Sequence, residues 1–225
     1  MSPMSEPVLI SWSGGKDSAM VLESLRMDSH WHVAGLLTNV DENGDVYGQG
    51  IPRAILHRQA TLLDLPLHEA MCAGTDNAAY ESSLAAALAE ARRRVPRLRH
   101  VAFGDLFLSD VRAYREALLA RHDFAGVFPL WGLDTASLAR TFIANGHRAA
   151  LCRIDTTQLD ARFCGREFDD ALLSELPSSC DPCGERGEFH TCLHAGPLLA
   201  EPIPFVRGAR APCDGQFVNL DFEIA

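Results

Sequence analysis

The 225 residues, of which 47% are hydrophobic, suffice for one sizeable core or for one α/β domain with a small appendage, and they exclude a second full catalytic domain. The formal net charge of -10 disfavours a general polyanion-binding surface, because neutralising phosphates requires clustered Lys and Arg. The start holds no basic segment followed by a long apolar one, and no run approaches the roughly 18 apolar residues of a membrane span. We therefore expect a cytoplasmic protein, and its seven scattered cysteines are expected to be reduced.

Short apolar runs alternate with segments of helical spacing over the first 155 residues. Strands are predicted at 8–12, 33–37, 66–70, 100–103, 126–130 and 149–154. Helices are predicted at 16–28, 52–64, 77–94, 109–122 and 134–145, with Pro52, Ser109 and Asp134 as start signals. This alternation implies right-handed βαβ crossovers, and hence an α/β fold with a mainly parallel sheet and helices on both faces.

The composition changes after about residue 177, where prolines and glycines become frequent enough to prevent long helices. We expect loops and short strands there, with 216–224 as an edge or antiparallel strand because its apolar and polar residues alternate. The predicted division is an α/β domain at 1–155 and a smaller C-terminal segment at 156–225. The only concentrated basic stretch, 92–99, is interpreted as a solvated helix end in preference to a nucleic-acid contact.

The most informative stretch is Ser-Gly-Gly-Lys-Asp-Ser at 13–18, directly after the first predicted strand and before the first predicted helix. Adjacent glycines remove Cβ atoms where a tight turn needs unusual dihedral angles and where phosphate oxygens approach the backbone. Unpaired N–H groups at the start of the helix, with the positive end of its dipole, make an anion site. The predicted phosphate-binding residues are Ser13, Gly14, Gly15, Lys16, Asp17 and Ser18, and Asp17 is also a candidate ligand of Mg²⁺ or of a metal-bound water.

This loop differs from two common nucleotide-binding loops. No Gly lies five residues before Gly15, and Lys16 is followed by Asp17 where the Walker pattern has Ser or Thr. The G-x-G-x-x-G pattern of dinucleotide-binding folds is also missing from it. An ordinary glycine turn between a strand and a helix is the alternative interpretation.

A second group of polar residues, Gly104, Asp105 and Asp110 with Arg112 and Arg115, follows a predicted strand and enters a predicted helix. The two arginines are three residues apart and share a helix face, where they can hold a carboxylate or a phosphate. The alternative is structural: Ser109 caps the helix, and Arg112 forms a salt bridge with Glu116.

A third group lies at 181–191, where Gly184 and Gly187 permit sharp bends and Glu185 and Glu188 bring two carboxylates into one short loop. Such a pair can receive a cationic or amine-bearing substrate, bind Mg²⁺ or accept a proton, and a polar surface turn is the alternative. The stretch also allows a zinc interpretation, because C-x-x-C supplies half of a common site, but no second C-x-x-C completes it. The residues in question are Cys180, Cys183, His190, Cys192 and His194.

Together these motifs resemble the diphthine–ammonia ligase family of PP-loop ATP pyrophosphatases. The resemblance covers almost the whole chain: S-G-G-K-D-S at 13–18, G-D-x-x-x-x-D-x-R-x-x-R at 104–115, Pro-Leu-Trp at 129–131, C-G-E-x-G-E at 183–188 and Gly-Pro-Leu at 196–198. It implies a HUP-type nucleotide-binding sheet at 1–155 with a substrate-side part at 156–225. It also places the adenine over the ends of the first strands, where Leu37, Thr38 and Asn39 are candidates, although a turn-forming role is as good an interpretation of Asn39.

The resemblance implies an ATP-dependent amide ligase with ATP and Mg²⁺ as cofactors. A substrate carboxylate attacks the α-phosphate, pyrophosphate leaves, and ammonia converts the acyl-adenylate to an amide. Lys16, Asp17, Glu185 and Glu188 are the expected catalytic residues, and nucleotide contacts extend to Gly104 and Asp105. Expected substrate contacts are Asp110, Arg112, Arg115, Glu185, Glu188 and His190.

One departure concerns the substrate side. Family members tend to read Glu-Tyr-Glu-Thr where this chain has Glu-Phe-His-Thr at 188–191, which changes the charge at His190 and leaves open a carboxylate acceptor other than diphthine. We expect a small-molecule or protein-borne carboxylate and ammonium as partners, with no membrane, nucleic acid disfavoured and a homodimer left open. The alternatives are a tRNA-modifying PP-loop enzyme of the thiolation or lysidine type and a non-catalytic nucleotide-binding sensor.

Overall fold

The computed structural model describes residues 5–42, 44–72, 74, 77–213 and 215–224. The chain divides into two compact units, and each is built from segments that are separated in the sequence. The first unit comprises Met1–Ser13, Asp17–Tyr47 and Asp64–Trp131. The second comprises Gly14–Lys16, Gly48–Leu63 and Gly132–Ala225.

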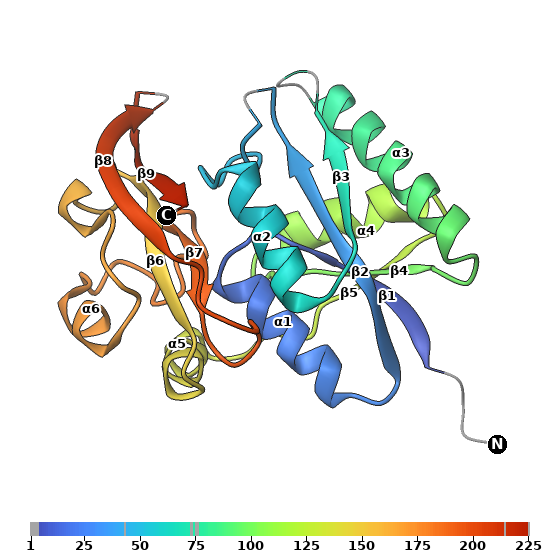
Figure 1. Cartoon of the computed structure of the whole chain (residues 1–225), viewed down its shortest axis with the longest axis horizontal. Coiled ribbons are helices and arrows are strands. Elements are labelled where there is room, and N and C mark those ends of the chain that lie inside the picture. The colour runs from blue at the N-terminus through green and yellow to red at the C-terminus, as the bar shows by residue number, and fades with distance from the viewer. Residues whose placement is uncertain (1–4, 43, 73, 75–76, 214, 225) are drawn as a thin grey trace. The chain divides into compact units, whose positions relative to one another are not determined.

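A five-stranded parallel sheet forms the centre of the first unit (Figure 1). Its strands in chain order are β1 (Glu6–Ser11), β2 (Trp31–Val40), β3 (Leu67–Met71), β4 (His100–Ala102) and β5 (Ala125–Val127). The spatial order is β3-β2-β1-β4-β5, so the chain first moves outward through β2 and β3 and then returns to the other side of β1. The predicted α/β fold is confirmed.

Helices α1 (Lys16–Met27), α3 (Asn77–Arg94) and α4 (Ser109–Ala120) connect these strands. Because parallel crossovers are right-handed, reversing the direction of strand addition moves the later helices to the opposite face of the sheet. One core accordingly joins α3 and α4 to one face of the sheet, with Leu88 and Leu118 packed in the same cluster as Leu9 and Val101.

A four-stranded antiparallel sheet, in the order β7-β6-β9-β8, forms the second unit together with several helices. The strands are β6 (Arg148–Asp155), β7 (Phe189–Ala195), β8 (Phe205–Cys213) and β9 (Phe217–Ile224). The helices are α2 (Arg53–Leu63), α5 (Thr135–Ala144), the 3-10 turn η1 (Ala161–Phe163) and α6 (Asp170–Glu175). Pro212 is accommodated in β8 because that strand lies at the edge of the sheet, where a missing N–H breaks no ladder.

Two expectations about the second unit need correction. The run 149–154 was expected in the parallel sheet, but β6 pairs antiparallel with β7 and β9. A strand buried on both faces reads as a continuous apolar run in either kind of sheet, so its composition does not reveal its direction. Because β6 pairs with C-terminal strands, the second compact unit includes everything from Gly132 onward, whereas the predicted division lay at residue 155.

The predicted helices agree with the structure to within two residues at each end. At the start of α5, Asp134 accepts a hydrogen bond from the Ser137 amide, and the helix stops at Asn145 with Gly146 at φ 82°. At the end of α3, Glu90 pairs with Arg93 and Arg94, which agrees with a solvated helix end. None of the helices in the described part of the chain combines the length and hydrophobicity that a membrane crossing requires.

Candidate functional site

The loop at 13–18 follows β1, the central strand of the parallel sheet. A hydrogen bond of 2.7 Å from the Trp12 amide to the Leu37 carbonyl extends the pairing of β1 with β2 by one residue. Because strands are added on opposite sides of β1, the chain direction switches between β1 and β4, and open α/β sheets bind ligands at the carboxyl ends of strands at such a point. The loops after β1 and after β4 are therefore the two that border this position.

Gly14 adopts φ +81°, a conformation that side-chain-bearing residues avoid. A Cβ atom there would lie 3.0 Å from Leu56 Cδ2 and 3.1 Å from Gln59 Oε1. The Gly14 carbonyl accepts from the Leu193 amide at 2.8 Å and from Gln59 Nε2 at 2.9 Å, and the fully buried Gln59 also donates to the Leu193 carbonyl. The first glycine of the motif is thus fixed by its neighbours as well as by its dihedral angle.

Lys16 is buried, with 2% of its surface exposed. Its amide donates to Thr191 Oγ1 at 3.1 Å, and its ammonium donates to the Cys183 carbonyl. The ammonium also lies 5.6 Å from the ring centroid of Phe168 and 5.7 Å from that of Phe189, within the range of cation–π attraction. The lysine is therefore held by the segment that precedes and enters β7.

Lys16 is also the only lysine in the sequence, since the other 19 of the 20 Lys and Arg residues are arginines. The motifs described above do not include this signal. A compact ammonium differs from a guanidinium in shape and hydration, so the two are not interchangeable at an enclosed position.

The structure brings Ser13, Asp17 and Ser18 together with Gly104 in the first unit. Ser13 Oγ donates to Ser18 Oγ at 3.3 Å. A Cβ atom on Gly104 would lie only 2.9 Å from Asp17 Cβ and 3.2 Å from the Asp17 carbonyl carbon. Gly104 is therefore the residue that allows the loop after β4 to touch the start of α1, and two sequence-predicted groups meet there.

Asp105, the next residue, is paired with Arg115. Arg115 Nε lies 2.7 Å from Asp105 Oδ2, Nη2 donates to Oδ1 at 3.2 Å, and the guanidinium lies over the ring of Phe103. The Arg115 side chain is 27% exposed and the Asp105 side chain is 14% exposed, so the pair is largely enclosed. Its geometry anchors the start of the loop after β4 to α4.

Arg112 takes the alternative role that the sequence left open. It pairs with Glu116 at 2.9 Å and lies over the rings of Phe128 and Trp131. Ser109 is the first residue of α4 and does not cap it, because the cap position belongs to Leu108, whose side chain has no acceptor. Asp110 is exposed in the first turn of the helix.

The end of β2 shows a different arrangement from the predicted one. The Leu37 side chain is buried in the core with Leu84 and Leu88. Asn39 lies inside β2, so it is not a turn residue, and its Nδ2 lies 3.5 Å from the Tyr80 hydroxyl. Within the described residues, the buried atoms Thr38 Oγ1 and Asn39 Oδ1 have no hydrogen-bond partner. Unpaired buried polar atoms are costly, which marks the end of β2 as a place where a ligand can supply the missing bonds.

Glu188 has a structural position inside the loop at 180–188. It is 1% exposed, and its two carboxylate oxygens accept from the amides of Asp181 at 2.8 Å and Arg186 at 2.9 Å. Asp181 in turn accepts from the Cys183 amide and from Thr135 Oγ1, both at 2.8 Å. These contacts make the two acids a scaffold for the loop, whereas a catalytic role of Glu188 stays a prediction.

The other half of the predicted carboxylate pair, Glu185, is only partly buried. Gly184 and Gly187 adopt φ +71° and +84°, which confirms the sharp bends expected on either side of it. Its amide lies 3.4 Å from Asp181 Oδ1.

The cysteines of the second unit are buried free thiols apart from the partly exposed Cys213. Burial raises the pKa of Cys180 and Cys192 to about 12 and that of Cys164 to about 11, and it raises the pKa of Cys152 well above its usual value. Of the zinc candidates, His194 lies 3.0 Å from Glu167 Oε2. Among the residues that the structure describes, no group of three or more His, Cys, Asp or Glu is arranged to hold a metal ion.

His190 lies in β7 directly opposite Arg153 of β6 and is partly exposed. Desolvation, Arg153 and Lys16 together lower the pKa of His190 to about 4. Its imidazole is therefore neutral at physiological pH.

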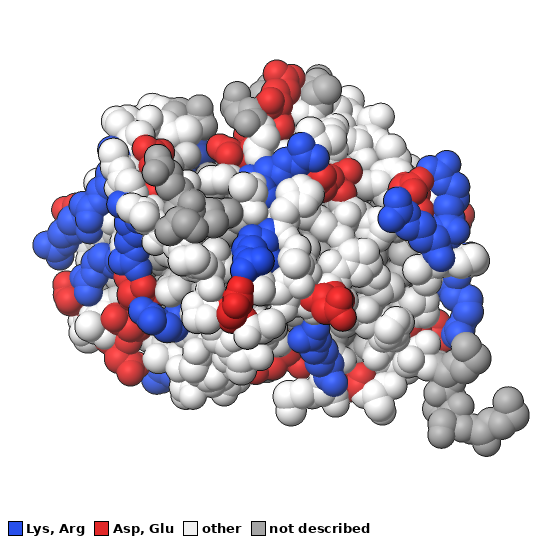
Figure 2. Space-filling model, viewed as in Figure 1, with Lys and Arg blue, Asp and Glu red and all other residues white. Residues whose placement is uncertain are grey.

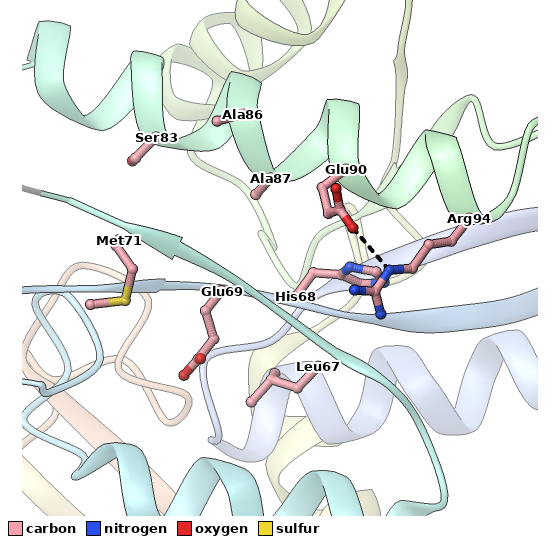
Figure 3. A pocket seen from close by; sticks show the side chains of 9 residues that line it. All are labelled: Leu67, His68, Glu69, Met71, Ser83, Ala86, Ala87, Glu90 and Arg94. Atoms are coloured by element: carbon pink, nitrogen blue, oxygen red, sulfur yellow. Dashed lines mark hydrogen bonds and ion pairs between the residues drawn. The ribbon is translucent and has the colours of Figure 1, made fainter.

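A cavity of about 440 Å³ lies along β3 and α3 (Figure 3). Desolvation and the nearby Arg94 lower the pKa of His68, which points toward Glu90 and Arg94. Glu90 Oε1 accepts from Arg94 Nε at 3.1 Å. The residues that line the cavity include none of the sequence-predicted site residues, and Glu90 and Arg94 pair with each other, so we do not place the candidate site there.

On the face shown in Figure 2, Lys and Arg side chains occur in small groups with Asp and Glu beside them, and they form no continuous basic surface. Comparison with protein-family models and with curated proteins finds no match for this sequence.

Proposed function

We propose that this protein is an ATP-dependent ligase that adenylates a carboxylate, releases pyrophosphate and forms an amide with ammonia. The observation that carries the proposal is the position of the Ser-Gly-Gly-Lys-Asp-Ser loop at the switch point of the parallel sheet, with Gly104 against Asp17. A glycine-rich loop leading into a helix at that point offers backbone N–H groups and the positive end of the helix dipole to phosphate oxygens.

Three further features support a nucleotide at this position. Ser13 and Ser18 supply hydroxyl groups, and Lys16 supplies the positive charge. Asp17 offers the single carboxylate with which Mg²⁺ often binds when nucleotide phosphates and water fill its other positions. Bound there, Mg²⁺ would neutralise part of the phosphate charge. The unpaired Thr38 and Asn39 atoms at the end of β2 suit the polar edge of a base.

The chemistry that follows binding rests on the family resemblance. In it the acceptor carboxylate attacks the α-phosphorus, the bond to the bridging oxygen breaks, and pyrophosphate leaves with the electron pair. Ammonia then attacks the acyl carbon, AMP leaves, and the proton lost by nitrogen passes to a base or to water. The acceptor is a small-molecule or protein-borne carboxylate.

The first experiment tests whether the α-phosphate is attacked. Purified protein would be incubated with Mg-ATP, labelled pyrophosphate and a panel of mono- and dicarboxylic acids or a cell extract, without ammonium. We expect acceptor-dependent incorporation of label into ATP, and with ammonium added we expect AMP and pyrophosphate as products. Release of ADP and phosphate from every mixture would contradict the proposal.

The single lysine permits a second, acceptor-independent experiment. An acyl-phosphate derivative of ATP transfers its acyl group to a lysine amine beside the bound phosphates, with ATP as the leaving group. Mass spectrometry should find the label on Lys16 and show that excess ATP prevents it. Lys16→Arg should lose ATP–pyrophosphate exchange by at least about tenfold, since a guanidinium does not replace an ammonium at this enclosed position, whereas an Arg97→Lys control at an exposed ion pair should retain it.

The two alternatives make different predictions. Thiolation chemistry that uses a cysteine needs a thiolate, and the raised pKa values of Cys152, Cys164, Cys180 and Cys192 argue against one at those positions. Steeply salt-dependent tRNA binding would favour the tRNA-modifying alternative. A protein that binds ATP equally well with and without Lys16, and that shows no exchange on any acceptor, would favour a nucleotide sensor.

A further inference from the structure

A row of polar side chains crosses one face of the antiparallel sheet in the second unit. Arg153 of β6 lies opposite His190 of β7 and opposite Asn219 of β9. Residues directly opposite one another in antiparallel strands project to the same face, so the three side chains share it. Arg153 Nη1 lies 3.4 Å from Asn219 Oδ1, and its guanidinium lies 4.0 Å from the ring centroid of Phe217.

Two cations converge on this part of β7. Arg153 is 8% exposed. The Lys16 ammonium donates to the Cys183 carbonyl and lies 5.7 Å from the ring centroid of Phe189, the residue before His190. Both charges lower the pKa of His190, and no carboxylate is among the groups that shift it. The two charged groups that act on the imidazole are thus both cations, and the residue itself is neutral at physiological pH.

Three carboxylates of the same unit already accept hydrogen bonds from donors of their own. Glu188 accepts from two backbone amides, and Asp181 accepts from the Cys183 amide and the Thr135 hydroxyl. Asp155 accepts from the amide and hydroxyl of Thr157 and from Gln158. A cationic ligand would have to compete with these donors for the carboxylates.

His190 itself is open to a ligand. It is partly exposed, and among the described residues no group donates to or accepts from its ring nitrogens. A neutral imidazole offers one N–H donor, which suits an oxyanion, and it adds no positive charge that would have to be desolvated.

We propose that Arg153 and His190, beside Lys16, form a binding site for an oxyanion that belongs either to the nucleotide phosphates or to a second carboxylate of the acceptor. The site deepens the proposed function and rests on it for the identity of both anions. It reverses the expectation drawn from Glu185 and Glu188, because it selects a negatively charged group where a carboxylate pair would select a cation.

The test measures binding without catalysis, so its result is separate from that of the exchange assay. The probes are inorganic pyrophosphate and succinate, titrated into the full chain, and the readout is the His190 imidazole resonance, identified by its loss in His190→Gln. An anion beside the ring stabilises the imidazolium, so either bound probe should raise the pKa of His190 from its value of about 4. Simultaneous binding of both probes would assign the site to the acceptor, and displacement of succinate by pyrophosphate would assign it to the nucleotide.

Three variants separate charge from shape. Because the His190 variants lack the imidazole resonance, their affinity for each probe is measured by calorimetric titration beside the wild type. His190→Gln keeps a neutral donor and should bind the probe within about threefold of the wild type, whereas His190→Glu places a carboxylate against the anion and should bind at least about tenfold more weakly. Arg153→Gln should also lose about tenfold. Because Arg153 is buried and that variant can fail to fold, the His190 pair, at a partly exposed position, carries the test with thermal unfolding as the check on folding.

Equal binding of pyrophosphate and succinate by His190→Glu and the wild type would overturn the inference, as would a His190 pKa that neither probe changes. Pyrophosphate exchange without any effect of the probes at His190 would leave the proposed function standing and remove this site. Anion binding at His190 without pyrophosphate exchange on any acceptor would support this site and contradict the proposed function.

Discussion

The segments 104–115 and 180–191 each hold four Asp, Glu or Arg residues, but the two neutralise their charges in different ways. In the first segment, arginines pair with carboxylates across or along a helix surface, as Arg115 does with Asp105 and Arg112 with Glu116. In the second, the buried carboxylate of Glu188 accepts from two backbone amides at 2.8 and 2.9 Å, and the guanidinium of the exposed Arg186 lies farther away at 3.7 Å. Water can replace an ion-pair partner at a surface, but it cannot reach a buried amide, so equivalent substitutions should cost more in the second segment.

The largest expected effect is that of Glu188→Ala. The substitution leaves the buried Asp181 amide and the partly buried Arg186 amide without an acceptor, so we expect the free energy of unfolding to fall by about 3 kcal/mol. Urea unfolding of the variant and the wild type measures this change in the free energy of unfolding. Glu185→Ala, in the same loop at a partly exposed position, is the matched control with an expected loss of about 0.5 kcal/mol. Equal losses would show that burial does not distinguish the two carboxylates.

The pH dependence of stability tests the second segment in another way. The pKa of His190 is about 4 in the folded protein, below its ordinary value of 6.5. The unfolded chain therefore takes up the proton first, and the contribution of His190 is fully present above pH 6.5 and decreases as the pH falls toward 4. We expect a loss of about 2 kcal/mol over that range.

His190→Gln should remove that part of the pH slope, measured as the difference between the urea unfolding curves of the two proteins at each pH. Other histidines with lowered pKa values, such as His68 and His100, contribute equally to both proteins. Parallel slopes for the wild type and the variant would mean that His190 titrates normally.

Gly104→Ala tests the contact between the first segment and the phosphate loop. The new Cβ would meet the Asp17 backbone and Cβ, so we expect a loss of about 2 kcal/mol and weaker ATP binding. Gly132→Ala is the control. Gly132 has φ +75°, and an added Cβ would meet no atom within 4 Å, so this substitution tests backbone strain without a steric clash. We expect it to lower the free energy of unfolding by about 1 kcal/mol. Calorimetric titration with ATP should separate them, and the comparison fails if both variants bind ATP equally well.

The smallest effects belong to the two arginines of α4. Arg115→Gln breaks an enclosed pair with Asp105 and should cost about 1.5 kcal/mol, whereas Arg112→Gln breaks a more exposed pair and should cost about 0.5 kcal/mol. Unfolding at low and high salt checks the assignment, since salt should reduce the Arg112 effect more. A larger loss of stability for Arg112→Gln than for Arg115→Gln would mean that the contacts of Arg112 with the rings of Phe128 and Trp131 stabilise the fold more than its ion pair does.

Local patterns predicted the elements well because periodicity and end signals act over a few residues. Asp134 and Gly146 mark the ends of α5, and a hydrophobic face marks α3. The direction of β6 was predicted wrongly, since the choice between parallel and antiparallel partners depends on strands more than thirty residues away.

The candidate site shows the same limit. The position of the loop at 13–18 was predicted correctly between a strand and a helix, and the sole lysine adds a signal in the sequence that was available. The bonds from Gln59 to Gly14, the buried position of Leu37 and the amides around Glu188 depend on folding.

By itself, the sequence determined where this chain forms helices and strands and which short segments concentrate chemistry, because backbone propensity and side-chain type are local properties. Only the tertiary structure decided which charges are already neutralised and which polar groups remain open to a ligand. Hydrogen-bond partners and burial come from residues far apart in the chain, and they separate the scaffold carboxylate of Glu188 from the open imidazole of His190.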